Sequence, residues 1–313
     1  MVVSVPESNL DGRYQGGTMP LERGERHITV NGVRQWVRVA GPERQTPPLI
    51  IVHGGPGGNL WTFERTVGER LEADRPVVYW EQRGCGRSDL PARPNDYSIP
   101  LLVSDLYGVI QALGIERCSL LGFSFGAELA LELTLAHPAH VDRLVLQCPS
   151  VGDRRRIAMV QLFGLLQSAR GDAQRRIQQL IETDLPIEAA TERAWSLVDS
   201  EAVDRLLFVS QEHARRNRRM WQESGLTNTG DMERALDRQE SPAVPLHRRI
   251  AALCHPALVV VGLYDRNVGV EVARDVAATL PNARLEVFER SAHFPDIEET
   301  ERYVASVNAF LDG

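Results

Sequence analysis

The sequence contains no lysine, since all 35 of its basic residues are arginines. This absence excludes any mechanism in which a lysine forms a Schiff base or acts as the general base. The 313 residues carry a net charge of −7, which argues against a nucleic-acid partner, because such partners select a basic surface. The chain also lacks any run of roughly 18 apolar residues, the length that spans a bilayer, so we expect no membrane partner.

Cysteine is scarce as well. No two of the four cysteines form a Cys-x-x-Cys pair: Cys85, Cys118, Cys148 and Cys254. We therefore expect packed free thiols rather than disulfides or zinc ligands. The first residues have neither the basic region nor the apolar run of a secretory signal. Together these features predict a cytoplasmic protein.

Short apolar runs alternate with helical patterns along most of the chain. After a flexible leader at residues 1–26, the turn dipeptide Asn31-Gly32 joins two alternating segments into a β-hairpin over residues 28–39. Further strands are expected at 48–52, 76–80, 118–121, 144–147, 257–261 and 285–288, and helices at 98–113, 125–137, 270–280 and 297–311. This alternation predicts the α/β class, with a mostly parallel central sheet flanked by helices.

The alternation stops at residues 150–246. There the sequence shows helical patterning, many Arg, Gln and Glu residues, and no convincing strand. Strands and helices alternate again after this block. We therefore expect a core formed by residues 27–149 and 247–313, and an inserted helical cap formed by residues 150–246.

The pentapeptide Gly122-Phe123-Ser124-Phe125-Gly126 is the first motif that carries chemistry. It matches Gly-x-Ser-x-Gly and lies between a predicted strand and a predicted helix, which is the context of a nucleophile elbow. In such an elbow the small flanking residues permit a tight bend, and the serine is presented at its tip. The alternative is a glycine-rich turn whose serine has no catalytic role, and the motifs described next count against it.

A glycine-rich loop follows the strand that ends at Val52, with the sequence His-Gly-Gly-Pro-Gly-Gly at residues 53–58. Glycine lets a backbone approach a ligand closely. An acyl-transfer enzyme needs N–H donors for its oxyanion, one from such a loop and one from the residue after the nucleophile. We assign the N–H groups of Gly55, with Gly54 as the alternate, and Phe125. A phosphate-binding loop is the competing interpretation, but Gly-x-Gly-x-x-Gly and a Walker lysine are both lacking.

The acid and the base that serve a serine nucleophile follow it in this chain order: Asp or Glu, then His. Asp265 and His293 each lie directly after one of the last two predicted strands. The carboxyl ends of parallel strands share one edge of the sheet, so Ser124, Asp265 and His293 are expected to meet there. His293 would accept the Ser124 proton, and Asp265 would fix the tautomer of His293. Among the other histidines, His53 belongs to the glycine loop and is interpreted as structural.

These residues resemble the α/β-hydrolase superfamily over residues 27–150 and 245–312. A narrower resemblance, to the proline iminopeptidase family, rests on the glycine loop together with Trp80-Glu-Gln-Arg-Gly-Cys-Gly-Arg-Ser88. It implies the α/β-hydrolase fold and a serine hydrolase, an aminopeptidase in particular. That family usually has Asp at the place of Glu81 and Trp at the place of Phe125. The fold's other position for the acid, after the sixth strand, holds Cys148 here, which favours Asp265.

The resemblance also implies an amine-binding site in the cap. The family has glutamates near an Ala-Trp-Ser-x-Trp-Glu stretch that bind the free α-amine of the substrate, and residues 194–199 read Ala-Trp-Ser-Leu-Val-Asp. Asp199 replaces the first glutamate with a side chain one methylene shorter, and Glu212 is a second candidate. Candidates for the lining of the substrate pocket are Trp195, Trp221, Phe163 and Phe208, although aromatic residues at helical spacing more often belong to a core.

Three hypotheses follow from these motifs. The first is an aminopeptidase or amidase that acts on small N-terminal residues such as proline. The second is an ester, lactone or other acyl hydrolase with a repurposed cap. The third is a non-catalytic member of the fold that serves as a receptor or scaffold. In the enzymatic cases the substrate is a small molecule or short peptide, and the Ser–His–Asp chemistry requires no cofactor or metal.

Overall fold

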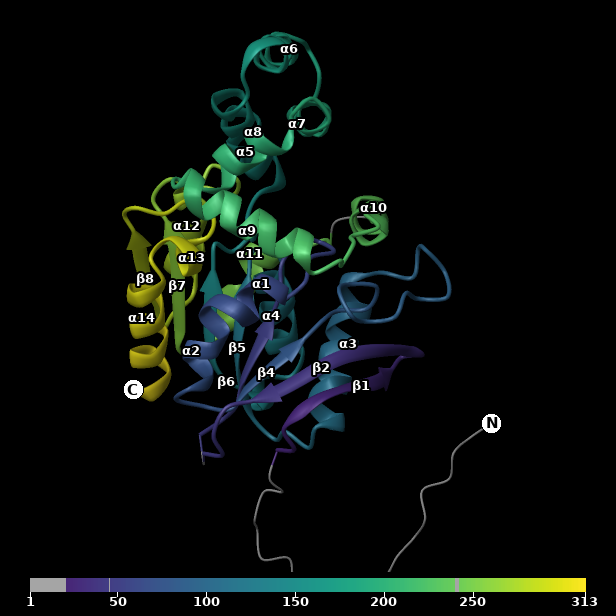
Figure 1. Cartoon of the computed structure of the whole chain (residues 1–313), viewed down its shortest axis with the longest axis vertical. Coiled ribbons are helices and arrows are strands. Elements are labelled where there is room, and N and C mark those ends of the chain that lie inside the picture. The colour runs from purple at the N-terminus through teal and green to yellow at the C-terminus, as the bar shows by residue number, and fades with distance from the viewer. Residues whose placement is uncertain (1–20, 45, 240–241) are drawn as a thin grey trace, which may run out of the picture.

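An eight-stranded sheet lies at the centre of the structure, a computed structural model that describes residues 21–44, 46–239 and 242–313 (Figure 1). The strands run in the order β1-β2-β4-β3-β5-β6-β7-β8. β1 and β2 pair antiparallel to their neighbours, and all other pairs are parallel. The bounds are β1 Gly24–Val30, β2 Val33–Ala40, β3 Leu49–Val52, β4 Val77–Trp80, β5 Cys118–Phe123, β6 Val141–Gln147, β7 Ala257–Gly262 and β8 Ala283–Phe288.

The first hairpin has the turn that its sequence predicts. Asn31 and Gly32 both have positive φ angles, 45° and 77°, as a type I′ turn requires at its two central positions. The ladder continues away from the turn as far as Gly24, which pairs with Val39. β1 therefore begins before residue 27, and the boundary predicted for the leader lies too late. Most of that leader, residues 1–20, falls outside the described residues.

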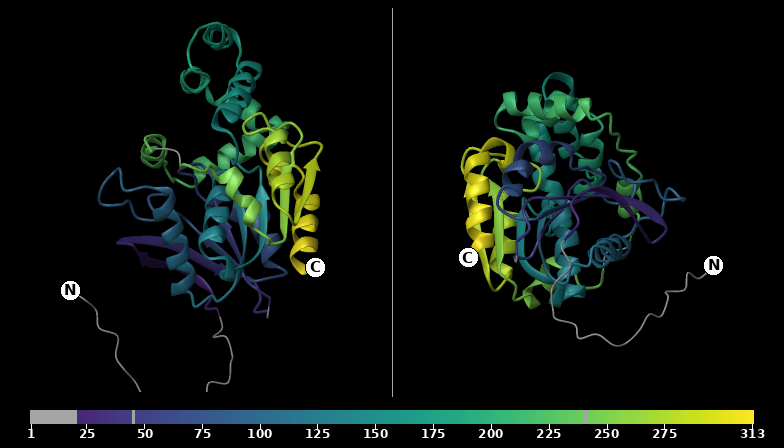
Figure 2. Two further views of the ribbon diagram at one scale, coloured as in Figure 1. Left: turned by 180° about the vertical axis from the view of Figure 1, so that it is seen from behind. Right: turned by 60° about the horizontal axis from the view of Figure 1, so that its bottom comes forward.

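Helices cover both faces of the sheet and complete two apolar cores (Figure 2). Alternate residues of one strand enter opposite cores: Ile50 belongs to one core and Ile51 to the other, as the period of two in a strand demands. One face carries α3 (Ile99–Ala112), α4 (Phe125–Ala136) and α12 (Val270–Thr279). The other carries α1 (Trp61–Phe63), η1 (Glu64–Gly68), α2 (Glu69–Glu72) and α14 (Thr300–Asp312).

Short elements complete this core at its ends. They are η2 (Pro138–His140), α11 (Leu246–Arg249), η3 (Ile250–Ala252) and α13 (Pro295–Glu298). The closing helix predicted at 297–311 is thus divided, because α13 ends before Glu299 and α14 begins after it.

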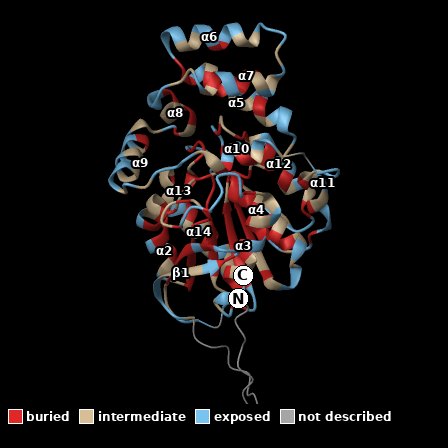
Figure 3. Ribbon diagram, turned by 90° about the vertical axis from the view of Figure 1, so that its right-hand side faces the viewer, coloured by how far each residue is buried: buried red, intermediate tan, exposed pale blue. Residues whose placement is uncertain are grey.

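The segment between β6 and β7 is helical, and no strand occurs in its described residues. It forms α5 (Arg154–Ser168), α6 (Gly171–Ile181), α7 (Ile187–Trp195), α8 (Ser200–Leu207), α9 (Gln211–Glu223) and α10 (Asp231–Asp237). In Figure 1, α5 to α8 stand beyond the edge of the sheet toward which the parallel strands point. Helices α5 to α8 share a small apolar core of their own that includes Leu162, Ile177 and Leu206. Figure 3 shows the largest concentration of buried residues in the sheet below them.

None of the helices in the described part of the chain is both long and apolar enough to cross a membrane.

Candidate active site

Ser124 occupies a strained turn between β5 and α4. Its φ of 53° and ψ of −116° lie in a region that non-glycine residues seldom adopt, and such strain concentrates at functional sites. The flanking glycines are required by close packing. A Cβ atom on Gly126 would lie 2.0 Å from the Val52 carbonyl oxygen, and one on Gly122 would lie 2.6 Å from Ala127 Cα. The turn therefore has the geometry predicted for a nucleophile elbow.

Asp265 and His293 form a buried hydrogen-bonded pair. The Nδ1 atom of His293 donates to Oδ2 of Asp265 over 2.9 Å. The other carboxylate oxygen accepts the backbone N–H groups of Asn267, at 2.9 Å, and Val268, at 3.0 Å. Burial alone would raise the pKa of Asp265, but His293 and these two donors hold it below its usual value. Because the carboxylate can only accept, the proton of the neutral imidazole resides on Nδ1 and leaves Nε2 as an acceptor.

The three residues predicted for catalysis lie at one edge of the sheet. Ser124 follows β5, Asp265 follows β7 and His293 follows β8. The ring of Phe123, next to the serine, has its centroid 5.1 Å from that of His293. In the described part of the chain, no hydrogen bond joins the Ser124 hydroxyl to His293, and Nε2 instead lies 3.3 Å from Nδ2 of Asn267. The catalytic roles of the three residues stay a prediction.

The glycine loop packs directly on the serine. A Cβ atom on Gly54 would lie 2.6 Å from the Phe123 carbonyl oxygen and 3.0 Å from the Cβ of Ser124, so a larger residue there requires the backbone to shift. Gly55 has a φ of 131°, a conformation open to glycine but not to other residues. Phe125 is the first residue of α4, and its N–H group has no partner within the helix. The backbone can thus present N–H groups beside Ser124, and the assignment of Gly55 and Phe125 as oxyanion donors stays a prediction.

His53 is a structural residue of this loop. Its Nε2 atom accepts the backbone N–H of Gln82 at 3.1 Å, and its Nδ1 atom lies 2.9 Å from the Gly54 carbonyl oxygen. This pattern requires a neutral ring with its proton on Nδ1. Burial lowers the pKa of His53, in keeping with that form. Nε2 therefore connects the loop to the segment after β4, and Nδ1 donates within the loop.

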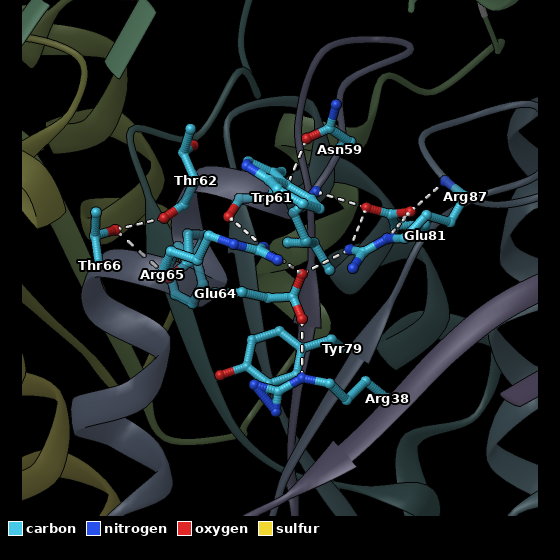
Figure 4. A network of polar contacts seen from close by, with 12 residues as sticks. Arg38, Asn59, Trp61, Thr62, Glu64, Arg65, Thr66, Tyr79, Glu81 and Arg87 are labelled. Atoms are coloured by element: carbon cyan, nitrogen blue, oxygen red, sulfur yellow. Dashed lines mark hydrogen bonds and ion pairs between the residues drawn. The ribbon is translucent and has the colours of Figure 1, made fainter. Parts of the chain in front are cut away.

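A network of carboxylates and guanidinium groups holds the far end of the glycine loop (Figure 4). Glu81 is fully buried, and its Oε1 atom accepts the backbone N–H of Leu60 at 3.0 Å and Nη2 of Arg87 at 2.7 Å. Arg87 also donates to Glu64 at 2.6 Å, and Glu64 accepts from Arg38 at 2.9 Å. Each buried charge in this chain of contacts faces an opposite one, which offsets the cost of removing it from water. The network fixes where the loop meets α1.

The two predicted amine-binding residues of the cap, Asp199 and Glu212, are both exposed and lie at the beginnings of helices. Asp199 is exposed, and its carboxylate accepts the backbone N–H of Ala202 at 2.8 Å as the N-cap of α8. Leu207, at the other end of α8, accepts the backbone N–H of His293. Asp199 therefore lies about 12 Å along the helix axis from Leu207, the residue that contacts His293, at a rise of about 1.5 Å per residue. Glu212 is exposed in the first turn of α9. An ammonium-binding role for either residue stays a prediction.

The four aromatic residues predicted to line the substrate pocket differ in burial. Trp195 and Trp221 are both half-buried, and Nε1 of Trp195 donates to Gln161 at 3.4 Å. Phe163 is exposed on α5. Phe208 is buried and stacks on Phe294, with ring centroids 4.7 Å apart. Phe208 therefore packs the cap against the His293 loop, and this packing accounts for its burial. Its role in lining a substrate pocket stays a prediction.

Several polar residues around the site were not predicted from the sequence. Gln161 of α5 donates through Nε2 to Oδ1 of Asn267 at 3.1 Å. Glu298 accepts the backbone N–H groups of residues 209, 210 and 292. Asn228, between α9 and α10, donates to the carbonyl oxygen of Pro56 at 3.4 Å. The only sequence signal was that Asn267 lies two residues after Asp265, since the other contacts join segments distant in the chain.

Cys148, Asp265 and His293 place potential metal-ligating atoms within 4.8 Å of one another. The chemistry of the set does not favour a metal ion. Burial raises the pKa of the Cys148 thiol well above its usual value, whereas a cysteine ligand must be a thiolate. Nδ1 of His293 carries the proton that it donates to Asp265. The three residues are better explained as an acid–base pair packed against a neutral thiol.

Comparisons with known proteins show the family of the chain. A family model described as the alpha/beta hydrolase fold matches residues 47–300. The chain therefore belongs to the α/β-hydrolase family, and it is a hydrolase enzyme. Within that family it resembles the proline iminopeptidases.

Three similar proteins illustrate the range of the family. The proline iminopeptidase of Heyndrickxia coagulans is 26% identical over 282 residues, which are 85% of this chain and 90% of that one. The 2-hydroxymuconate semialdehyde hydrolase of Pseudomonas sp. (strain CF600) is 28% identical over 277 residues, 84% of this chain and 86% of that one. The crystal structure of a proline iminopeptidase-related protein from Thermus thermophilus has a TM-score of 0.77 at 25% identity, covering 93% of this chain and 98% of that one.

Proposed function

We propose that the protein is a serine hydrolase that cleaves an amide, peptide or related acyl bond through an acyl-enzyme on Ser124. Among known activities, that of a proline-iminopeptidase-type aminopeptidase is the one it most resembles. The observation that carries the proposal is the buried hydrogen bond between Asp265 and His293, at the sheet edge where Ser124 occupies its strained turn. A receptor or scaffold would have no use for this strain or for an ionised buried aspartate.

The proposed reaction proceeds in two steps. Ser124 Oγ attacks the carbonyl carbon of the substrate while its proton passes to Nε2 of His293. Asp265 stabilises the resulting imidazolium, and the N–H groups of Gly55 and Phe125 donate to the oxyanion. His293 then gives its proton to the leaving amine or alkoxide. Water attacks the acyl-enzyme with His293 as the base, and the carboxylic acid and free Ser124 are released.

An aminopeptidase needs a group that binds the substrate ammonium, and we propose Asp199 or Glu212 for this role. If either carboxylate does so, Asp199→Asn or Glu212→Gln raises KM for amino substrates and leaves ester turnover nearly unchanged. The opposite result, an unchanged KM, removes the residue from the site. Because Asp199 already caps α8, a second candidate function is favoured by the structure: an ester, lactone or other small-molecule acyl hydrolase with a repurposed cap.

Paired initial rates distinguish the two candidates. Native enzyme is assayed on proline p-nitroanilide and on p-nitrophenyl butyrate, with Ser124→Ala as the blank. Strong anilide cleavage that depends on Ser124 supports the aminopeptidase. Ester cleavage alone supports the second candidate, and the absence of any Ser124-dependent turnover contradicts both.

A further inference from the structure

The base of the proposed catalytic site already has a hydrogen-bond partner. Nε2 of His293 lies 3.3 Å from Nδ2 of Asn267. Because Nδ1 donates to Asp265, Nε2 is an acceptor with one lone pair in the plane of the ring. The Ser124 hydroxyl must donate to this same lone pair before it can lose its proton. Asn267 and Ser124 therefore compete for one atom.

The cap determines which way the Asn267 amide faces. Nε2 of Gln161, on α5, donates to Oδ1 of Asn267 at 3.1 Å, so the NH₂ group of Asn267 is turned toward His293. The Oε1 atom of Gln161 in turn accepts from Nε1 of Trp195, on α7, at 3.4 Å. A row of four hydrogen-bonded side chains thus runs from the indole of Trp195 through Gln161 and Asn267 to the proposed base, His293. Gln161, Trp195 and Asn267 are each half-buried, so none of them is fully enclosed by the protein.

We propose that Asn267 is a positioning residue that occupies the catalytic base in the resting enzyme and releases it when a substrate engages Gln161 and Trp195. The inference rests on the proposed function, because it takes His293 as the base. When Gln161 leaves Asn267, the NH₂ group of Gln161 loses its acceptor, and an oxygen of the substrate can take that place. The preferred substrate therefore offers a carbonyl or carboxylate oxygen to Gln161 and an apolar face to Trp195. A short ester that does not extend to the cap lacks both.

The test compares Asn267→Leu, which keeps the branched shape of the side chain but cannot donate, with the native enzyme on p-nitrophenyl acetate. Removal of the competing hydrogen bond is expected to raise kcat by about three- to tenfold with little change in KM. Labelling of Ser124 by a small fluorophosphonate is expected to accelerate by the same factor. A residue that only supports the fold would lower both rates.

A second variant keeps the test independent of the folding of the first. Gln161→Leu removes the hydrogen bond through which the cap orients the Asn267 amide. Like Asn267→Leu, it is expected to raise both rates. The matched control is Gln174→Leu, which should leave the rates unchanged, because Nε2 of Gln174 donates to the Leu166 carbonyl within the cap.

The outcomes separate the inference from the proposed function. Native enzyme without Ser124-dependent turnover or labelling contradicts the proposed function. Native enzyme that is active, with Asn267→Leu and Gln161→Leu equal to it or slower on the short ester, overturns the role of Asn267 alone.

Discussion

At the scale of single residues, Asp265 accepts three hydrogen bonds in the folded protein. One carboxylate oxygen accepts from His293, and the other accepts two backbone N–H groups. These donors all stabilise the charged form, which outweighs the effect of burial and lowers the pKa of Asp265. An asparagine at this position offers one acceptor and one donor group, and so cannot satisfy the same set.

Asp265→Asn is predicted to lower kcat by about 10⁴-fold, because the amide would favour the wrong tautomer of His293. The measurement is kcat on the better of the two chromogenic substrates, with thermal unfolding to verify the fold. Asp172→Asn is the control, since Asp172 is exposed on α6 and pairs with the exposed Arg175 of the same helix. A loss of less than tenfold in the Asp265 variant would show that another group orients the base.

Asp296 is a second buried carboxyl near the site. Burial raises its pKa from 3.8 to about 6, although Nε2 of Gln147 donates to its Oδ1 atom at 2.6 Å. Between these two pH values the folded state binds more protons than the unfolded chain. Stability from this group is therefore present at pH 4 and is lost as pH rises to 6 and above.

Asp296→Asn removes the titrating carboxyl group and keeps a side-chain oxygen that accepts the hydrogen bond from Gln147. The free energy of unfolding of the variant, relative to native protein, is predicted to increase by about 2 kcal/mol between pH 4 and pH 7, from a shift of about two pKa units. Denaturant titrations at the two pH values measure it. A difference that does not vary with pH would mean that the carboxyl of Asp296 is already ionised at pH 4.

At the scale of elements, the junction of α8 and α9 is attached to the loop that carries His293. The backbone N–H of His293 donates to the Leu207 carbonyl oxygen at 3.0 Å. Glu298 accepts the N–H groups of Val209, at 2.9 Å, and Ser210, at 2.7 Å, with one oxygen and that of Ala292, at 2.8 Å, with the other. One carboxylate thus joins the cap to the residue before His293.

Glu298→Gln is predicted to destabilise the protein by about 1–3 kcal/mol, because the NH₂ of glutamine would face an N–H group that needs an acceptor. The kcat is expected to fall as well, since the His293 loop loses a support. Glu301→Gln, at an exposed residue of α14, is the control. Equal stability of the two variants would contradict the bridging role of Glu298.

The elements of the core were largely predictable, because each depends on local patterns. Alternation gave the strands, Asn31-Gly32 the hairpin, and Gly-x-Ser-x-Gly the elbow. The positions of Asp265 and His293 followed from chain order and strand ends. Asn267 was not predicted, because its contact with Gln161 joins residues 106 positions apart and depends on how the cap folds over the sheet.

At the scale of the whole molecule, helices α5 to α8 of the cap have an apolar core separate from those of the sheet, whereas α10 contributes Met232 and Ala235 to one core of the sheet. The sheet fixes the residues proposed to react, whereas the cap approaches them through side chains such as Gln161, Asn228 and Phe208. Sequence motifs therefore predict the chemistry better than the substrate. The exposed Asp199 illustrates this, because its position in the motif suggested amine binding and its contacts show a helix cap.

The most direct test of the central claim is fluorophosphonate labelling followed by peptide mass spectrometry. The account predicts a single adduct at Ser124 in native protein, no adduct in Ser124→Ala, and much slower labelling in His293→Ala, which lacks the base. An adduct on another residue, or native protein that does not label, would contradict the assignment of Ser124 as the nucleophile.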